Sequence, residues 1–187
     1  MARVPYLSKE ELPPSKRHLY DQIAHHRGRV PRSFAALLNS PEVASRVAAI
    51  GEYLRYETTA LPPEVREIAT LTTAQQLGCQ YVWTRHVPLA RAAGVREEVI
   101  NAIRDGQPPR RLLPKETVFV QYTRELLGDR RVRSATFSAA EHLLGREGII
   151  DLVVTIGFYA LQCYTVAALE VELEDGVEPL LPESTPP

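Results

Sequence analysis

The sequence predicts an all-α fold, and three observations lead to that expectation. Apolar residues recur at helical spacing, as in Ile68, Leu71 and Ala74. Prolines stand where helices are expected to begin and glycines where they are expected to end, which suits the backbone geometry of each residue type. Short β-branched stretches, such as residues 118–120, follow helical periodicity and lack the alternation that is typical of a strand.

Start and stop signals define the expected helices in chain order. They cover residues 15–27, 32–38, 42–56, 63–77, 79–93, 96–104, 115–127, 138–144 and 147–173. The chain has 187 residues, of which 44% are hydrophobic, and this length and composition suit one helical domain over residues 14–174. The proline-rich, polar ends form an expected N-terminal arm (1–13) and C-terminal tail (175–187) that order against a partner subunit.

Charge and composition exclude several classes of function. The net charge of −1 and the pI of about 6.5 argue against nucleic acid and anionic membranes as partners. The apolar run 149–169 is interrupted by Asp151, Gly157 and Gln162, which favours a buried helix over a membrane span. Two cysteines without a secretory signal indicate a reducing, cytoplasmic location, and Cys163 is interpreted as a small core residue.

The segment from Glu67 to His86 carries the chemistry. Proline and an acid at residues 62–64 predict a helix start, and Gly78 is a good terminator, so Cys79 would open the next helix. A thiol at a helix N-terminus has its thiolate stabilised by the helix dipole. His86 lies two turns further along the same expected stripe, which also holds Val82, Leu89, Ala90 and Ala93.

Five residues are the candidates for function in this segment. Glu67 reaches the same place as His86 if the two helices pack antiparallel, and an acid beside an imidazole tunes a proton donor near neutral pH. The predicted catalytic residues are therefore Glu67, Cys79 and His86. Tyr81 and Arg85 are predicted to bind substrate, with the Tyr81 hydroxyl at the rim of the pocket. No group of His, Asp, Glu or Cys has metal-ligand spacing, so neither a metal nor another cofactor is expected.

This pattern, Glu-x11-Cys-x-Tyr-x4-His, resembles the signature of the carboxymuconolactone decarboxylase and alkyl hydroperoxidase D-like superfamily. The hydroperoxidase branch carries a second cysteine three residues after the first, and Val82 stands there in this chain. Neighbouring segments are similar as well: 66–71, 86–95, 27–31, 37–42, 151–153 and 156–159. The resemblance implies an all-helical domain that assembles as a trimer or hexamer and acts on a small molecule.

Three functions remain open at this point. The first is a cofactor-free lyase or proton-transfer enzyme, in which His86 with Glu67 protonates carbon as carbon dioxide leaves and Arg85 holds a carboxylate. The second is a thiol-dependent hydroperoxidase that uses Cys79 without the usual second cysteine. The third is a non-catalytic oligomeric binding protein. A resolving thiol near Cys79 would favour the hydroperoxidase, and an anion-binding arginine in the pocket would favour the lyase.

Overall fold

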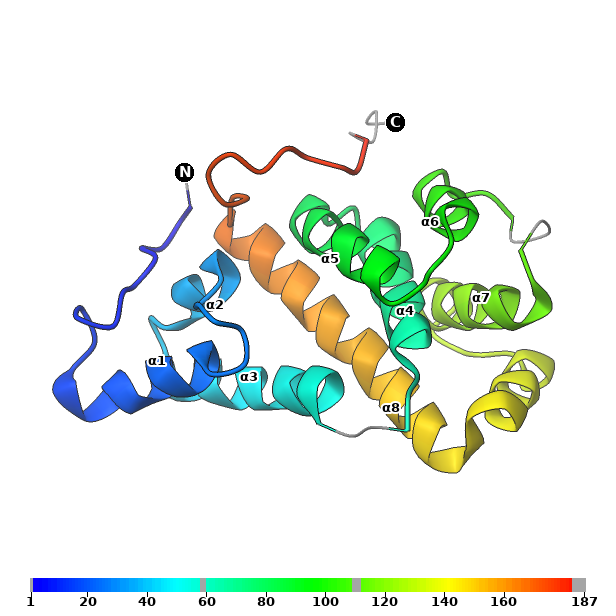
Figure 1. Cartoon of the computed structure of the whole chain (residues 1–187), viewed down its shortest axis with the longest axis horizontal. Coiled ribbons are helices and arrows are strands. Elements are labelled where there is room, and N and C mark those ends of the chain that lie inside the picture. The colour runs from blue at the N-terminus through cyan, green and yellow to red at the C-terminus, as the bar shows by residue number, and fades with distance from the viewer. Residues whose placement is uncertain (1, 58–59, 109–111, 183–187) are drawn as a thin grey trace. The chain divides into compact units, whose positions relative to one another are not determined.

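The computed structural model of the chain describes residues 2–57, 60–108 and 112–182 and confirms the all-α expectation within them (Figure 1). A short 3-10 helix, η1 (Pro14–Lys16), precedes the α-helices. The α-helices are α1 (Arg17–Ala24), α2 (Arg32–Leu37), α3 (Pro41–Tyr56), α4 (Pro63–Gln76), α5 (Gln80–Ala92), α6 (Glu97–Arg104), α7 (Pro114–Gly128) and α8 (Ser134–Leu169).

The chain divides into two compact units. Unit 1 comprises Met1–Thr58 and Tyr164–Val177, and unit 2 comprises Thr59–Cys163 and Glu178–Pro187. The long helix α8 therefore contributes to both units, and each unit is described by itself below.

The ends of α8 differ most from the expected helix bounds. The helix begins at Ser134 instead of residue 138, and the first turn is closed by the Phe137 N–H, which donates to the Arg133 carbonyl at 2.9 Å. It ends at Leu169 instead of residue 173, because Glu170 adopts a left-handed conformation (φ 51°). Inside it, Gly145 (φ 69°, ψ 178°) interrupts the helical geometry, as expected from the glycine between the two predicted helices.

Unit 1 contains α1, α2 and α3, and each of these helices contributes buried residues. Ile23 of α1 and Leu54 of α3 are among its buried core residues, and α3 packs on both α1 and α2. The N-terminal arm hydrogen bonds to this same unit: the Arg3 N–H donates to the Leu169 carbonyl at 2.9 Å and the Leu7 N–H to the Ala35 carbonyl at 3.1 Å. Contact of the arm with a partner subunit stays a prediction.

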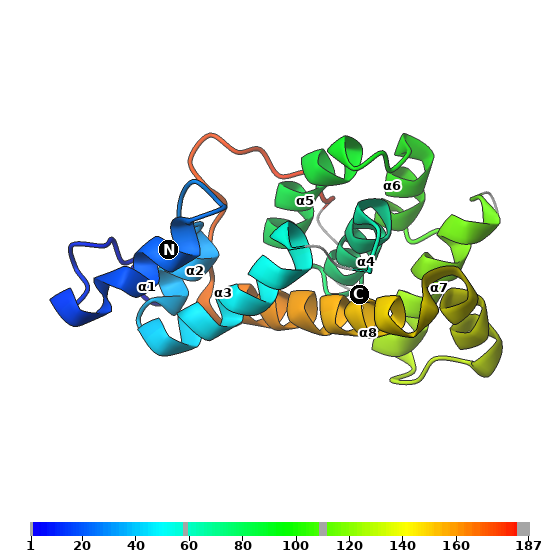
Figure 2. The same ribbon diagram turned by 60° about the horizontal axis from the view of Figure 1, so that its bottom comes forward.

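Unit 2 is built around α4, which packs against α5, α6 and α7 (Figures 1 and 2). Because neighbours cover this helix, nearly every residue from Val65 to Ala74 is buried. Gly78 (φ 61°) makes the tight turn that follows α4, and the Cys79 N–H donates to the Ala74 carbonyl at 2.8 Å. The α4–α5 hairpin holds the residues that the sequence selects as functional.

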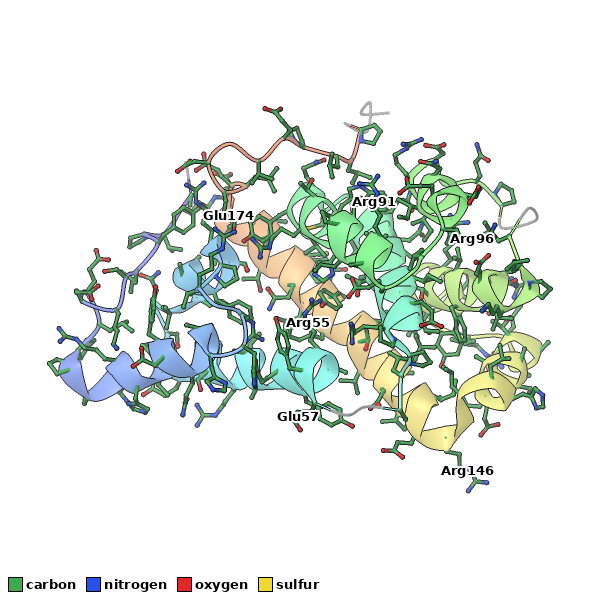
Figure 3. All side chains as sticks on the ribbon, in the orientation of Figure 1. Arg55, Glu57, Arg91, Arg96, Arg146 and Glu174 are labelled. Carbon is green, nitrogen blue, oxygen red and sulfur yellow. The ribbon has the colours of Figure 1, made fainter. Side chains whose placement is uncertain are left out.

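Helix α8 presents two different faces in unit 2. Leu152, Ile156 and Tyr159 are buried, whereas Ile150 is 62% exposed. By length and composition alone, α8 could cross a membrane, although 44% of its apolar window is buried within the chain. At the Gly145 break, Arg146 points away from the ribbon (Figure 3).

Candidate functional site

The α4–α5 hairpin brings Glu67 and His86 together. The His86 Nδ1 lies 2.7 Å from a Glu67 carboxylate oxygen, and the two residues are 1% and 9% exposed. A buried carboxylate needs a donor, and a buried imidazole needs an acceptor that fixes its tautomer and orientation. The sequence predicted this contact from the spacing of the two residues across the Gly78 turn.

Arg66 is a third member of this cluster that the sequence analysis did not select. Its Nε donates to the other oxygen of Glu67 at 3.3 Å, and its side chain is 13% exposed. Adjacent residues on a helix do not normally face each other, so helical spacing gave no signal for the pair. The Glu67 carboxylate therefore lies between a guanidinium and an imidazole.

Cys79 occupies the N-cap position of α5 and is 6% exposed. A hydrogen bond from the Cys163 thiol holds the pKa of Cys79 below its usual range, and the backbone N–H groups of Tyr81 and Val82 lower it further. Neither N–H makes a well-formed capping bond to the sulfur, so their effect is mainly electrostatic. Burial opposes these effects by disfavouring the thiolate.

Helix α8 links the two ends of the site. The Tyr159 ring meets the His86 ring edge to face, with centroids 4.7 Å apart. One turn further along α8, Cys163 contacts Cys79 and is 2% exposed. The interpretation of Cys163 as a buried residue is correct, but its contact with Cys79 could not be read from residues so far apart in the sequence.

Tyr81 and Arg85 lie together on α5. The Arg85 guanidinium carbon is 5.8 Å from the centroid of the Tyr81 ring, a cation–π arrangement. Tyr81 itself is 5% exposed. Their role as substrate-binding residues stays a prediction. The sequence placed Leu89 on the apolar stripe of this helix, and that prediction was wrong. Leu89 is 37% exposed, whereas Val87 is buried.

Two buried polar groups flank Tyr159 on α8 and were not singled out as functional by the sequence analysis. The Thr155 hydroxyl and the Gln162 amide nitrogen have no hydrogen-bond partner among the described residues. Both side chains are buried, at 0% and 5% exposure. Because buried polar groups are nearly always paired, these two are candidates to contact a bound small molecule.

The C-terminal segment contacts α5 near its start. The Leu180 N–H donates to the Thr84 hydroxyl at 3.0 Å. In the orientation of the Gln80 amide that satisfies its neighbours, the amide nitrogen donates to the Leu181 carbonyl at 2.6 Å. Part of the predicted tail is thus bonded beside Cys79, whereas residues 183–187 lie outside the described residues.

A separate cluster in unit 1 has ligand atoms that could hold a metal ion. The nitrogens of His25 and His26 and a carboxylate oxygen of Glu52 all lie within 4.8 Å of one another. The sequence analysis missed this group because Glu52 comes from α3. The Arg27 guanidinium donates to the same carboxylate at 2.6 Å, so a cation there would compete with an existing positive charge.

Solved structures share this fold at low sequence identity. A peroxidase-related protein with an alkylhydroperoxidase D core, from Ralstonia eutropha JMP134, aligns with a TM-score of 0.76 and 19% identity over 93% of both chains. The debrominase Bmp8 aligns with a TM-score of 0.73 and 14% identity over 92% of both chains. Bmp8 has also been solved as a cysteine-to-alanine variant in complex with 2,3,4-tribromopyrrole.

A family match agrees with the fold. No curated protein matches the chain. Residues 41–125, which include the whole α4–α5 hairpin, match the carboxymuconolactone decarboxylase family. The segment that carries the α4–α5 hairpin is therefore similar to the carboxymuconolactone decarboxylase family, and the fold is similar to that of alkyl hydroperoxidase D-like proteins.

Proposed function

We propose that the protein is a thiol-dependent reductase of small organic hydroperoxides, with Cys79 as nucleophile and His86 as proton donor. The observation that carries the proposal is the environment of Cys79, in which a neighbouring thiol and the start of α5 favour the thiolate. The thiolate is the reactive form of cysteine. The sequence alone favours the lyase, and the contact with Cys163 reverses that order.

The reaction divides between the two ends of the site. The Cys79 thiolate attacks the terminal oxygen of the hydroperoxide, the O–O bond breaks, and Cys79 becomes a sulfenic acid. The departing alkoxide takes a proton from His86, which Glu67 orients through the 2.7 Å contact. Cys79 and His86 are seven residues apart, roughly 10 Å along a helix. Helical side chains lean toward the N-terminus, which shortens this gap, and a water can complete it.

A lyase remains the second candidate because Arg66 lies beside the Glu67–His86 pair. A guanidinium there suits the carboxylate of a lactone acid, and His86 could protonate the carbon left by carbon dioxide. The Arg66 guanidinium already contacts Glu67, and this contact weakens its attraction for a substrate carboxylate. For this reason we favour the thiol reaction over the lyase.

Turnover of cumene hydroperoxide and tert-butyl hydroperoxide with dithiothreitol as reductant tests the proposal. We expect consumption of hydroperoxide by the wild-type protein and a fall to the rate of buffer alone for Cys79→Ser, since a hydroxyl is a poor nucleophile toward peroxide. A parallel screen follows bromide release from bromopyrroles and carbon dioxide release from lactone acids. Carbon dioxide release that survives Cys79→Ser and is lost in His86→Ala would replace the proposal by the lyase. If none of the hydroperoxides, bromopyrroles or lactone acids is turned over, the non-catalytic binding protein becomes the favoured function.

We also propose that the protein is a homo-oligomer, a trimer or hexamer. The support is the apolar face of α8 in unit 2, where Ile150 is 62%, Val153 and Val154 each 39%, and Leu161 40% exposed. Their spacing places them on one side of the helix with Gly157 at the centre. Large exposed apolar surfaces mark sites of association, and a second copy of the chain offers a matching face.

Light scattering checks the oligomer directly. We expect three or six times the 20.9 kDa of one chain, and a shift toward that single-chain mass for Ile150→Lys, because a charge cannot be buried cheaply in an apolar contact. Leu143→Lys is the matched control: Leu143 is also exposed on α8, at 49%, but precedes the Gly145 break. A stable monomer of the wild type, or a protein recovered only with lipid, would contradict this proposal.

A further inference from the structure

The second sulfur at this site comes from α8. The disulfide partner of the hydroperoxidase branch would stand three residues after Cys79, where this chain has Val82. Cys163 hydrogen bonds to Cys79 through space instead. These are the two cysteines of the chain, and both are reduced and buried.

Two side-chain contacts link α8 to α5 at this place. The Tyr159 ring rests on His86, and Cys163 is four residues beyond Tyr159 on the same face of α8. Tyr159 is 3% exposed and Cys163 2% exposed, so neither side chain has much freedom to turn away. The two helices thus meet at two contacts: the His86 ring against the Tyr159 ring, and the Cys79 sulfur against the Cys163 sulfur.

We propose that Cys163 is the resolving thiol of the site: after Cys79 is oxidised, the two sulfurs close an intramolecular disulfide between α5 and α8. A disulfide requires the sulfurs at about 2.0 Å, and thiols that already share a hydrogen bond need a small side-chain movement to reach it. The role of Cys163 rests on the thiol chemistry proposed above, because Cys163 can form the disulfide only after Cys79 has been oxidised.

The chemical balance of the step is simple. The Cys163 sulfur attacks the sulfur of the Cys79 sulfenic acid, forming the S–S bond as the S–O bond breaks. Hydroxide leaves and takes the Cys163 proton, so one water is released. The hydrogen bond to Cys79, and then burial, raise the pKa of Cys163 above its usual range. Cys163 therefore waits as a thiol and loses its proton only when the hydroxide departs. An external dithiol then reduces the disulfide and restores both thiols.

The test oxidises the reduced protein with one equivalent of hydrogen peroxide, or with diamide, and maps the cysteines by mass spectrometry without reduction. We expect wild-type protein to lose two hydrogens and yield a peptide pair linked through Cys79 and Cys163. Cys163→Ser should give no link and retain a Cys79 sulfenic acid that dimedone traps. Cys163→Ala serves as a second variant, because it removes both the hydrogen-bond donor and the sulfur at little change in size.

The outcomes separate this proposal from the function itself. Disulfide formation without hydroperoxide turnover would support Cys163 as the resolving thiol and would contradict the proposal that organic hydroperoxides are the substrates. Turnover that depends on Cys79, with wild-type protein that accumulates sulfenic acid or links only between chains, would reject Cys163 as resolving thiol and keep the function. Because the decisive measurement is on the wild-type chain, a variant that folds poorly cannot obscure it.

Discussion

Replacing His86 by alanine is expected to lower turnover by about 10²–10⁴-fold, the usual contribution of general acid–base catalysis. The alkoxide released when the O–O bond of the hydroperoxide breaks needs a proton, and His86 is the imidazole that α5 and Glu67 hold at the site. The measurement is kcat for an organic hydroperoxide at saturating reductant. His86→Gln, which keeps more of the side-chain volume against Tyr159, should lose a similar factor and so exclude a packing defect.

Two comparisons define what would contradict this expectation. His142→Ala removes an exposed histidine of α8 and should leave the rate unchanged. The rate at which iodoacetamide alkylates Cys79 should also survive His86→Ala, because the thiolate is favoured by Cys163 and the start of α5. An unchanged kcat in His86→Ala would assign the proton to another group, and a lost alkylation rate would mean that His86 acts on the thiol itself.

Glu67→Ala should destabilise the fold by about 3–5 kcal/mol, the cost of removing one partner from a buried charged pair. The carboxylate is 1% exposed and accepts hydrogen bonds from both Arg66 and His86, so its loss removes an acceptor that both side chains use. Urea unfolding followed by the fluorescence of Trp83 measures the change. Trp83 is the one tryptophan of the chain and is 1% exposed.

Two further variants test the cause. Glu67→Gln keeps an acceptor oxygen of the same reach and should cost clearly less than the alanine variant. Glu98→Ala is the matched control: this carboxylate is 71% exposed and lies 3.7 Å from Arg96, and exposed ion pairs contribute about 0–1 kcal/mol. If Glu67→Ala cost no more than Glu98→Ala, the buried cluster would not be a structural element of unit 2.

The sequence predicted the parts of this site that depend on local spacing. Glu67 and His86 lie on consecutive helices joined by a glycine turn, so periodicity alone placed them near each other. The contact of Cys163 with Cys79 depends on how α8 packs, which no local pattern encodes. The same applies to the end of α8, where Glu170 adopts an unusual backbone conformation that helix propensity does not reveal.

The hydrogen bonds of the C-terminal segment have a kinetic consequence for the thiol. Leu180 and Leu181 are bonded to Thr84 and Gln80 near the start of α5, close to the reactive sulfur. Segments tied by few bonds open locally at a free energy far below that of global unfolding. We therefore expect local opening of residues 180–181 to expose the surroundings of Cys79 without unfolding of unit 2. Substitutions at Leu180 or Leu181 are expected to alter the reactivity of Cys79 while leaving the melting temperature unchanged.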